Sequence, residues 1–180
     1  SVPTGKFFSL FNKTGIESYF NAEKAESGLF VFIGLAAIIT ALVFLIFIKE
    51  RFYTGASFPL LLVGLLLAVV GYTVYQRSDA DRMRNVYAYD MNPHELKEKE
   101  IPRMKTVMHN FVIYRYTELF LLLAGIALYI YFIRDFYNDF WRGFGLALAV
   151  MSLIALTADF FAEQRGKKYL DGLEEYCKGK

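Results

Sequence analysis

Three charged side chains stand at the edges of long apolar runs, where they could hold an ion or a proton. Arg115 and Glu118 precede the run 119–133, and Asp159 follows the run 143–158. Glu118 lies 16 residues before Arg134, at one side of the turn between these runs. Asp159 lies 17 residues after Arg142, at the other side of the same turn. At about 1.5 Å per helical residue, both carboxyl groups are about 24–26 Å from that turn, so the spacing predicts one polar layer.

This layer has two interpretations. Carboxylates inside a membrane are costly and often mark an ion or proton path. We hypothesise that Arg115 neutralises Asp159 or Glu118 and leaves one carboxylate available. Alternatively, the charges form an interfacial ion cluster that only shortens the two helices. His109 and Thr157 are expected to extend the layer in either case.

Other chemistry finds little support in the residues. The chain has no GxGxxG after a strand, no P-loop, no HExxH and no GxSxG motif. Two histidines and one cysteine cannot complete a standard zinc site, so we expect no metal and no cofactor. The 20 Lys and Arg nearly balance the 18 Asp and Glu without a long basic block, so no nucleic acid is expected. An enzyme is therefore the least supported class, and we expect none.

Four apolar runs must position the charged layer. They span residues 29–48, 58–75, 119–133 and 143–158 in a chain that is 56% hydrophobic. A membrane-spanning helix needs about 20 residues, and the two shorter runs can span if flanking charges snorkel. The connections at 49–57 and 134–142 are short and therefore favour hairpins. The sequence predicts an all-α integral membrane protein with four transmembrane helices in two antiparallel hairpins.

The polar segments define the remaining organisation. We expect an interfacial segment at 1–28, a first transmembrane hairpin at 29–75, a helical stalk at 76–116, a second hairpin at 117–162 and a tail at 163–180. The first apolar run begins well inside the chain, so no cleaved signal peptide is expected. The segments 1–28, 76–116 and 163–180 carry 16 of the 20 Lys and Arg. The positive-inside rule then places both termini in the cytoplasm, typical of an inner-membrane protein.

Two of these polar segments have recognisable helical patterns. Residues 6–20 alternate aromatic and polar side chains, which favours an amphipathic helix in the membrane interface or one packed on the end of the bundle. In the stalk, Asn92 and Pro93 resemble an N-cap and first helical residue, with Glu95 at the capping-box position. Pro102 should kink or interrupt the helix that follows. The stalk's mixed charges are expected to lie on a solvated face.

The two halves of the chain resemble each other weakly. Residues 48–53 and 133–137 are similar, and Gln-Arg recurs at 76–77 and 164–165, with a spacing of about 85–88 residues. This pattern indicates a parallel internal repeat, although membrane hairpins in general share such features. Small residues also recur at helical spacing, which allows close helix contact inside the bundle or between copies. They are Gly64, Ala68, Gly71, Gly145, Ala149 and Ser152.

Two functions remain open at this point. The first is a non-enzymatic membrane protein that forms a homo-oligomeric assembly or pore, or that docks a cytoplasmic partner on residues 76–116. The second is a small ion- or proton-coupled transporter that uses the carboxylates near the cytoplasmic ends of the third and fourth spans. Apart from Thr40, Ser152 and small residues, the middle of every run is apolar. A coupled transporter needs polar groups there, so the first hypothesis is favoured.

Overall fold

The computed structural model describes residues 11–179. Its long helices are α1 (Lys13–Val43), α2 (Arg51–Met91), α4 (Ile101–Phe132) and α5 (Asp139–Lys178). Short elements extend or join them: η1 (Phe44–Ile48), α3 (Pro93–Glu95), η2 (Leu96–Glu100) and η3 (Phe136–Asn138). Four helical segments are long and apolar enough to cross a membrane. The predicted all-helical class with four such helices is confirmed for the described residues.

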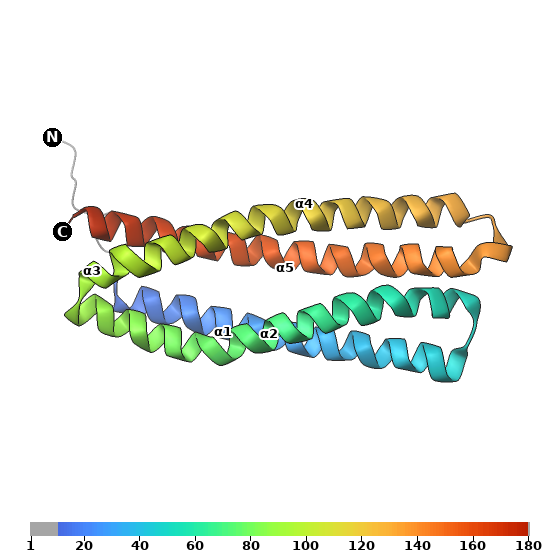
Figure 1. Cartoon of the computed structure of the whole chain (residues 1–180), viewed down its shortest axis with the longest axis horizontal. Helices are drawn as coiled ribbons and strands as arrows, with labels where there is room; N and C mark the ends of the chain where they lie inside the picture. The colour runs from blue at the N-terminus through green and yellow to red at the C-terminus, as the bar shows by residue number, and fades with distance from the viewer. Residues whose placement is uncertain (1–10, 180) are drawn as a thin grey trace.

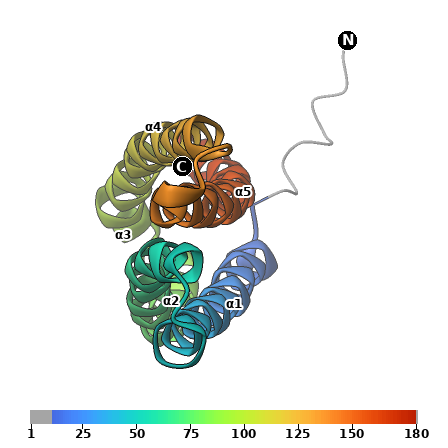
Figure 2. The same cartoon turned by 90° about the vertical axis from the view of Figure 1, so that its right-hand side faces the viewer.

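The long helices lie side by side along one axis (Figure 1). Helix α1 packs beside α2, and α4 packs beside α5. The view along the axis shows the two pairs stacked, with α2 and α5 in contact between them (Figure 2). Residues 13–28, 76–116 and 163–178 form one half of the bundle, called here the polar half. Residues 29–75 and 117–162 form the apolar half. That the pairs are transmembrane hairpins stays a prediction.

Helix α1 begins and ends with recognisable backbone signals. The Asn12 side chain accepts a hydrogen bond from the Gly15 amide at 2.7 Å, which caps the first turn. The last turn widens into the π-helix η1, where the Lys49 amide donates to the Phe44 carbonyl at 3.0 Å. Lys49 then adopts a left-handed conformation with φ of 57°, and Glu50 is extended. A left-handed residue ends a helix because the next amides leave its axis.

The junction between α2 and α4 differs in part from its prediction. Asn92 and Pro93 occupy the N-cap and first position of α3, but the Asn92 side chain makes no cap hydrogen bond. The Glu95 carboxylate instead accepts from Lys99 at 2.8 Å, so the predicted capping box is absent. Pro102 lies in the first turn of α4, directly after the π-helix η2. The helix thus changes from π-helix to α-helix directly before the proline. Because Pro102 lies in the first turn of α4, its lack of an N–H costs few backbone hydrogen bonds.

The N-terminal segment is part of α1 rather than a separate interfacial helix, which corrects the first of its two interpretations. Helix α1 runs without a break from Lys13, and Ile16 and Phe20 are fully buried. They pack in one core cluster in the polar half, with Ala88, Leu96, Met104, Tyr169 and Leu173. Their apolar face is therefore buried by the chain's own helices. Residues 6–10 of the predicted amphipathic segment lie outside the described residues.

Glycines set the close approach within each helix pair. A Cβ added to Gly34 would lie 2.5 Å from the Gly64 carbonyl oxygen, between α1 and α2. A Cβ added to Gly125 would lie 2.7 Å from the Gly145 carbonyl oxygen, between α4 and α5. Real Cβ atoms do not approach so closely, so the helices touch through their backbones at these points. Such contacts maximise dispersion where lipid supplies no hydrophobic driving force.

A reciprocal contact joins the two pairs near the ends of α2 and α5. A Cβ added to Gly55 would overlap the Phe140 carbonyl, and a Cβ added to Gly143 would overlap the Phe52 carbonyl. Gly55 and Gly143 are 88 residues apart, as are Phe52 and Phe140. The α1–α2 pair and the α4–α5 pair thus exchange the same contact at a constant spacing in the sequence, as in an assembly with two-fold symmetry.

Candidate functional site

Arg115 has a different partner from the ones expected. Its Nη1 donates to Glu163 Oε2 at 3.0 Å, across the α4–α5 pair, rather than to Glu118 or Asp159. Glu163 lies one turn beyond Asp159 on α5. Because residues four apart share a helix face, this carboxylate competes for the same guanidinium. The position of Glu163, four residues after Asp159, was the feature of the sequence that could have predicted this ion pair.

The structure brings Glu118 and Asp159 together between α4 and α5. The two carboxyl groups are close enough to interact electrostatically. Glu118 Oε2 is buried and has no hydrogen-bond partner within residues 11–179. The matching depth inferred from residue counting agrees with this placement. The pair carries no neutralising arginine, because Arg115 is held by Glu163.

The other two residues proposed for this layer do not join it. His109 is exposed on α4. Thr157 donates its hydroxyl to the Leu153 carbonyl at 2.8 Å, one turn back on its own helix. This bond satisfies the hydroxyl locally, so Thr157 supplies no cross-helix polar contact.

The small residues singled out in the sequence lie at contacts inside the chain. The Gly34 position meets Gly64 and Ala68 on α2, and Gly71 lies against the backbone at Ser27. On the other pair, Gly145 and Ala149 lie against Gly125. Ser152 is buried on α5, and its hydroxyl has no partner among the described residues. These positions are occupied by the chain's own helices and are not open to a second copy.

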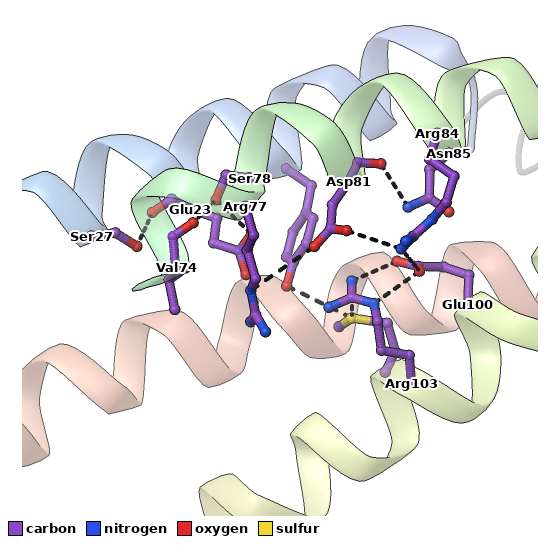
Figure 3. Close-up of polar contacts among 12 residues, drawn as sticks. Glu23, Ser27, Val74, Arg77, Ser78, Asp81, Arg84, Asn85, Glu100 and Arg103 are labelled. Carbon is purple, nitrogen blue, oxygen red and sulfur yellow. Dashed lines mark hydrogen bonds and ion pairs between the residues drawn. The ribbon is translucent and has the colours of Figure 1, made fainter. Parts of the chain in front are cut away.

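A buried cluster of charges in the polar half had no counterpart in the sequence-based expectations (Figure 3). Its centre is Glu100 of η2, which is 2% exposed. Arg103 of α4 donates to both carboxylate oxygens, from Nε at 2.9 Å and from Nη2 at 2.6 Å. The Tyr169 hydroxyl of α5 donates to Glu100 Oε1 at 3.2 Å. The two bonds between Arg103 and Glu100 are charge-assisted, and together they fix the orientation of both side chains.

Helix α2 enters the same network, which we call the Glu100 cluster. Arg84 Nη2 lies 3.0 Å from Asp81 Oδ1 and 3.9 Å from Glu100 Oε2. Arg77 Nε lies 3.9 Å from Asp81 Oδ2 on the same helix (Figure 3). The cluster therefore links α2, η2, α4 and α5 with alternating positive and negative groups. Such alternation offsets the desolvation of each charge.

Aromatic rings close the cluster on the α1 side. The Tyr19 and Tyr169 rings stack with centroids 4.2 Å apart and planes 6° apart. The Arg103 guanidinium lies 5.8 Å from the centre of the Phe20 ring. Burial raises the pKa of both tyrosines, so their hydroxyls remain protonated donors. Burial alone opposes the charge on Arg103, but the hydrogen bonds to Glu100 outweigh it and raise its pKa.

A second polar contact joins α1 to α2 nearby. The Ser78 hydroxyl lies 3.1 Å from Glu23 Oε2 and also donates to the Val74 carbonyl at 2.7 Å (Figure 3). Burial raises the pKa of Glu23 above its ordinary value, and the contact with Ser78 opposes that rise. Arg165 of α5 forms an ion pair with Glu26 of α1. These contacts attach α1 to the other helices of the polar half.

The sequence could not distinguish the Glu100 cluster from an exposed charged face. Arg77, Asp81 and Arg84 are spaced by three and four residues, as are Glu100 and Arg103. That spacing is the same for ion pairs on a solvated helix. Only the packing of α5 and η2 against α2 removes these charges from water. The expectation of a solvated face is thus wrong for Asp81 and Glu100, which are both buried.

The Glu100 cluster joins α2, η2, α4 and α5 through hydrogen bonds and ion pairs. The Glu100 carboxylate is fully hydrogen-bonded, and no group of three His, Cys, Asp or Glu side chains suited to a metal occurs within residues 11–179. No family model, no curated protein and no solved structure matches this chain.

Proposed function

We propose that this chain is a non-enzymatic membrane protein that docks a partner chain on a rigid helical extension in the cytoplasm. In this proposal the apolar half forms two antiparallel transmembrane hairpins, and both termini are cytoplasmic. The large apolar side chains that point outward from the apolar half support membrane insertion, because lipid would cover them. The reciprocal contacts at a spacing of 88 residues support a tandem duplication of one hairpin.

The observation that carries the proposal is an exposed apolar stripe on α2 outside the apolar half. Met83, Tyr87 and Met91 are 62%, 62% and 69% exposed. They recur every four residues and therefore lie on one face of the helix. Lipid does not cover this part of α2 in the proposed topology. A contiguous apolar surface facing water marks a site for another protein, and methionine is common on such surfaces.

The buried charges could hold the part of α2 that carries this stripe in a fixed position. The Glu100 cluster ties α2 to α4 and α5 directly behind the exposed face. Helices α2, α4 and α5 also continue from the apolar half into the polar half. A partner bound on the stripe would therefore be held at a fixed position relative to the membrane.

Site-specific photo-crosslinking in intact membranes tests the proposal. A benzophenone amino acid at Tyr87 is expected to capture one defined protein, either another copy of this chain or a different protein. The matched control carries the same group at Lys97, which is exposed on η2 and lies outside the stripe. Replacing Met83 and Met91 by serine should lower the yield of the crosslink at Tyr87 about tenfold, because two apolar contacts with the bound partner are lost.

The result that would overturn docking is equally specific. Crosslinking at Tyr87 that is no stronger than at Lys97, or that survives both serine substitutions, would leave the stripe without a partner. Mass spectrometry of the captured band separates self-association from a second protein.

The Glu118–Asp159 pair favours a second candidate, an ion- or proton-coupled transporter. A buried carboxylate oxygen without a partner, beside a second carboxyl group, is a place where a proton can be held. Flux through the purified protein in liposomes, with Asp159→Asn beside the wild type, separates the two functions. We expect no flux from either protein. Flux that Asp159→Asn changes would make transport the better proposal.

A further inference from the structure

A groove of about 410 Å³ lies on the α4–α5 pair where the apolar and polar halves meet. Its walls are mostly apolar, formed by Phe111, Leu119, Leu156, Phe160 and Phe161. Arg115, Asp159 and Glu163 line the same groove. Apolar walls beside charges of both signs suit a ligand that has an apolar chain and a zwitterionic end.

The charges around the groove are unbalanced. Arg115 forms an ion pair with Glu163, at 3.0 Å. Glu118 lies beside Asp159, and no Lys or Arg within residues 11–179 forms an ion pair with either carboxyl group. Two neighbouring carboxylates repel each other, and the repulsion is stronger where water is partly excluded. A positive group from outside the chain would relieve it at Asp159.

We propose that this groove binds a phospholipid whose headgroup ends in a primary ammonium. The ammonium lies at Asp159, the phosphate lies at Arg115, and an acyl chain follows the aromatic wall. The inference rests on the membrane insertion in the proposed function, because that insertion puts Arg115 and Asp159 at headgroup depth. The Arg115 guanidinium has five N–H donors, so it can hold a phosphate while it keeps Glu163.

The same geometry disfavours other common lipids. A choline headgroup carries the positive charge but has no N–H, so it cannot donate a hydrogen bond to Asp159. A glycerol headgroup on an anionic lipid has no cation and would face two carboxyl groups. One charge-assisted hydrogen bond to Asp159 corresponds to a preference of about tenfold or more.

Native mass spectrometry of the purified full chain tests this preference. Ethanolamine, choline and glycerol phospholipids with identical acyl chains are added separately to the protein in detergent. The wild type should retain the ethanolamine lipid about tenfold more strongly than the other two. Asp159→Asn should remove this preference. Arg115→Gln should weaken all three lipids, because each carries a phosphate.

Two further variants keep the test decisive. Thr157→Trp places a large ring at the groove without changing its charge, and it should weaken all three lipids even if a charge variant misfolds. Arg134→Gln removes an exposed charge at the opposite end of α4 and should change nothing. Equal retention of the three lipids by the wild type, an ethanolamine preference that persists in Asp159→Asn, or unchanged retention of all three lipids by Thr157→Trp would overturn the inference.

Membrane insertion is checked separately by carbonate extraction of cell membranes. A chain that stays in the membrane but shows no lipid preference overturns only the lipid site. A chain that carbonate extracts overturns the proposed membrane topology, on which the site depends.

Discussion

At the scale of single residues, the polar half depends on charges that water does not reach. Glu100 and Asp81 are buried, and each has an arginine partner on its own or a neighbouring element. A buried ion pair is weak evidence for net stability, but an unpaired buried charge is strongly destabilising. Substitutions should therefore be most harmful when they remove one partner and leave the other.

Glu100→Gln tests this asymmetry. The substitution removes the charge that balances Arg103 and weakens two hydrogen bonds, so we expect a loss of about 3–5 kcal/mol in the free energy of unfolding. The midpoint of thermal unfolding, followed by circular dichroism in detergent, measures it. Glu98→Gln is the matched control, because Glu98 is exposed and forms an exposed pair with His94, and it should cost less than about 0.5 kcal/mol. Equal effects of the two variants would show that the Glu100 cluster adds no stability.

Glu23 gives the polar half a defined pH dependence. Because burial raises its pKa, the folded chain holds the Glu23 proton more tightly than the unfolded chain does. Stability attributable to this group is therefore present at low pH and falls as the pH rises from the ordinary carboxyl value of 4.5 through the folded pKa.

Glu23→Gln should remove this dependence, because glutamine keeps an oxygen near Ser78 without a charge. We expect a higher unfolding midpoint than the wild type at neutral pH, and a difference that shrinks as the pH is lowered toward 4.5. Thermal unfolding of both proteins over a pH series measures it. A difference that grows as the pH falls would mean that Glu23 is stabilised as the carboxylate.

The sequence revealed part of the residue-scale picture. Counting along the apolar runs placed Glu118 and Asp159 at one depth, and they are neighbours in the structure. The same counting could not choose between the acceptors available to Arg115. Side-chain reach and the register of α4 against α5 made that choice, in favour of Glu163.

At the scale of elements, the helices follow the apolar runs but extend well beyond them. Helix α2 reaches Met91, although its apolar run ends at 75. Composition marks where lipid would end, whereas helix ends depend on local backbone signals such as Lys49 in the left-handed region. The apolar pattern of the N-terminal segment fitted both a membrane interface and the bundle core. The buried contacts of Ile16 and Phe20 decide for the core.

The crossing of α2 and α5 allows a test at this scale. Gly55→Ala and Gly143→Ala each place a methyl group on a carbonyl of the other helix, so each should lower stability by about 1–3 kcal/mol. If the α1–α2 pair and the α4–α5 pair are equivalent, the losses of stability in the two variants should be similar. The double variant should cost less than their sum, because one separation of the helices relieves both clashes.

Thermal unfolding of the single and double variants measures these effects. Gly28→Ala is the control, since a Cβ there would lie 3.7 Å from the Tyr75 ring, an ordinary contact. A large loss of stability in one of the variants Gly55→Ala and Gly143→Ala, with none in the other, would contradict the equivalence of the two helix pairs.

At the scale of the whole molecule, the two halves of the bundle differ in what covers their outer surfaces. The apolar half turns leucine, isoleucine and phenylalanine outward, while its backbones touch through glycine. The polar half buries an aromatic core and a charge network instead. A chain in water would reverse the first pattern, so the contrast itself indicates that lipid covers one half. Composition alone predicted this division, but the buried charge network of the polar half could not be read from it.

Cysteine accessibility tests the orientation that follows from this division. In a Cys177→Ser background, Asn138→Cys lies in the turn between α4 and α5, and Lys97→Cys lies on η2. Both side chains are exposed, so reagent access depends on the side of the membrane. Because 16 of the 20 Lys and Arg lie in the segments 1–28, 76–116 and 163–180, we expect the polar half to face the cytoplasm. A membrane-impermeant maleimide should then label Asn138→Cys in cells whose cytoplasmic membrane is intact, and Lys97→Cys only after that membrane is permeabilised. The opposite labelling would place Met83, Tyr87 and Met91 outside the cell, where a cytoplasmic partner could not reach them.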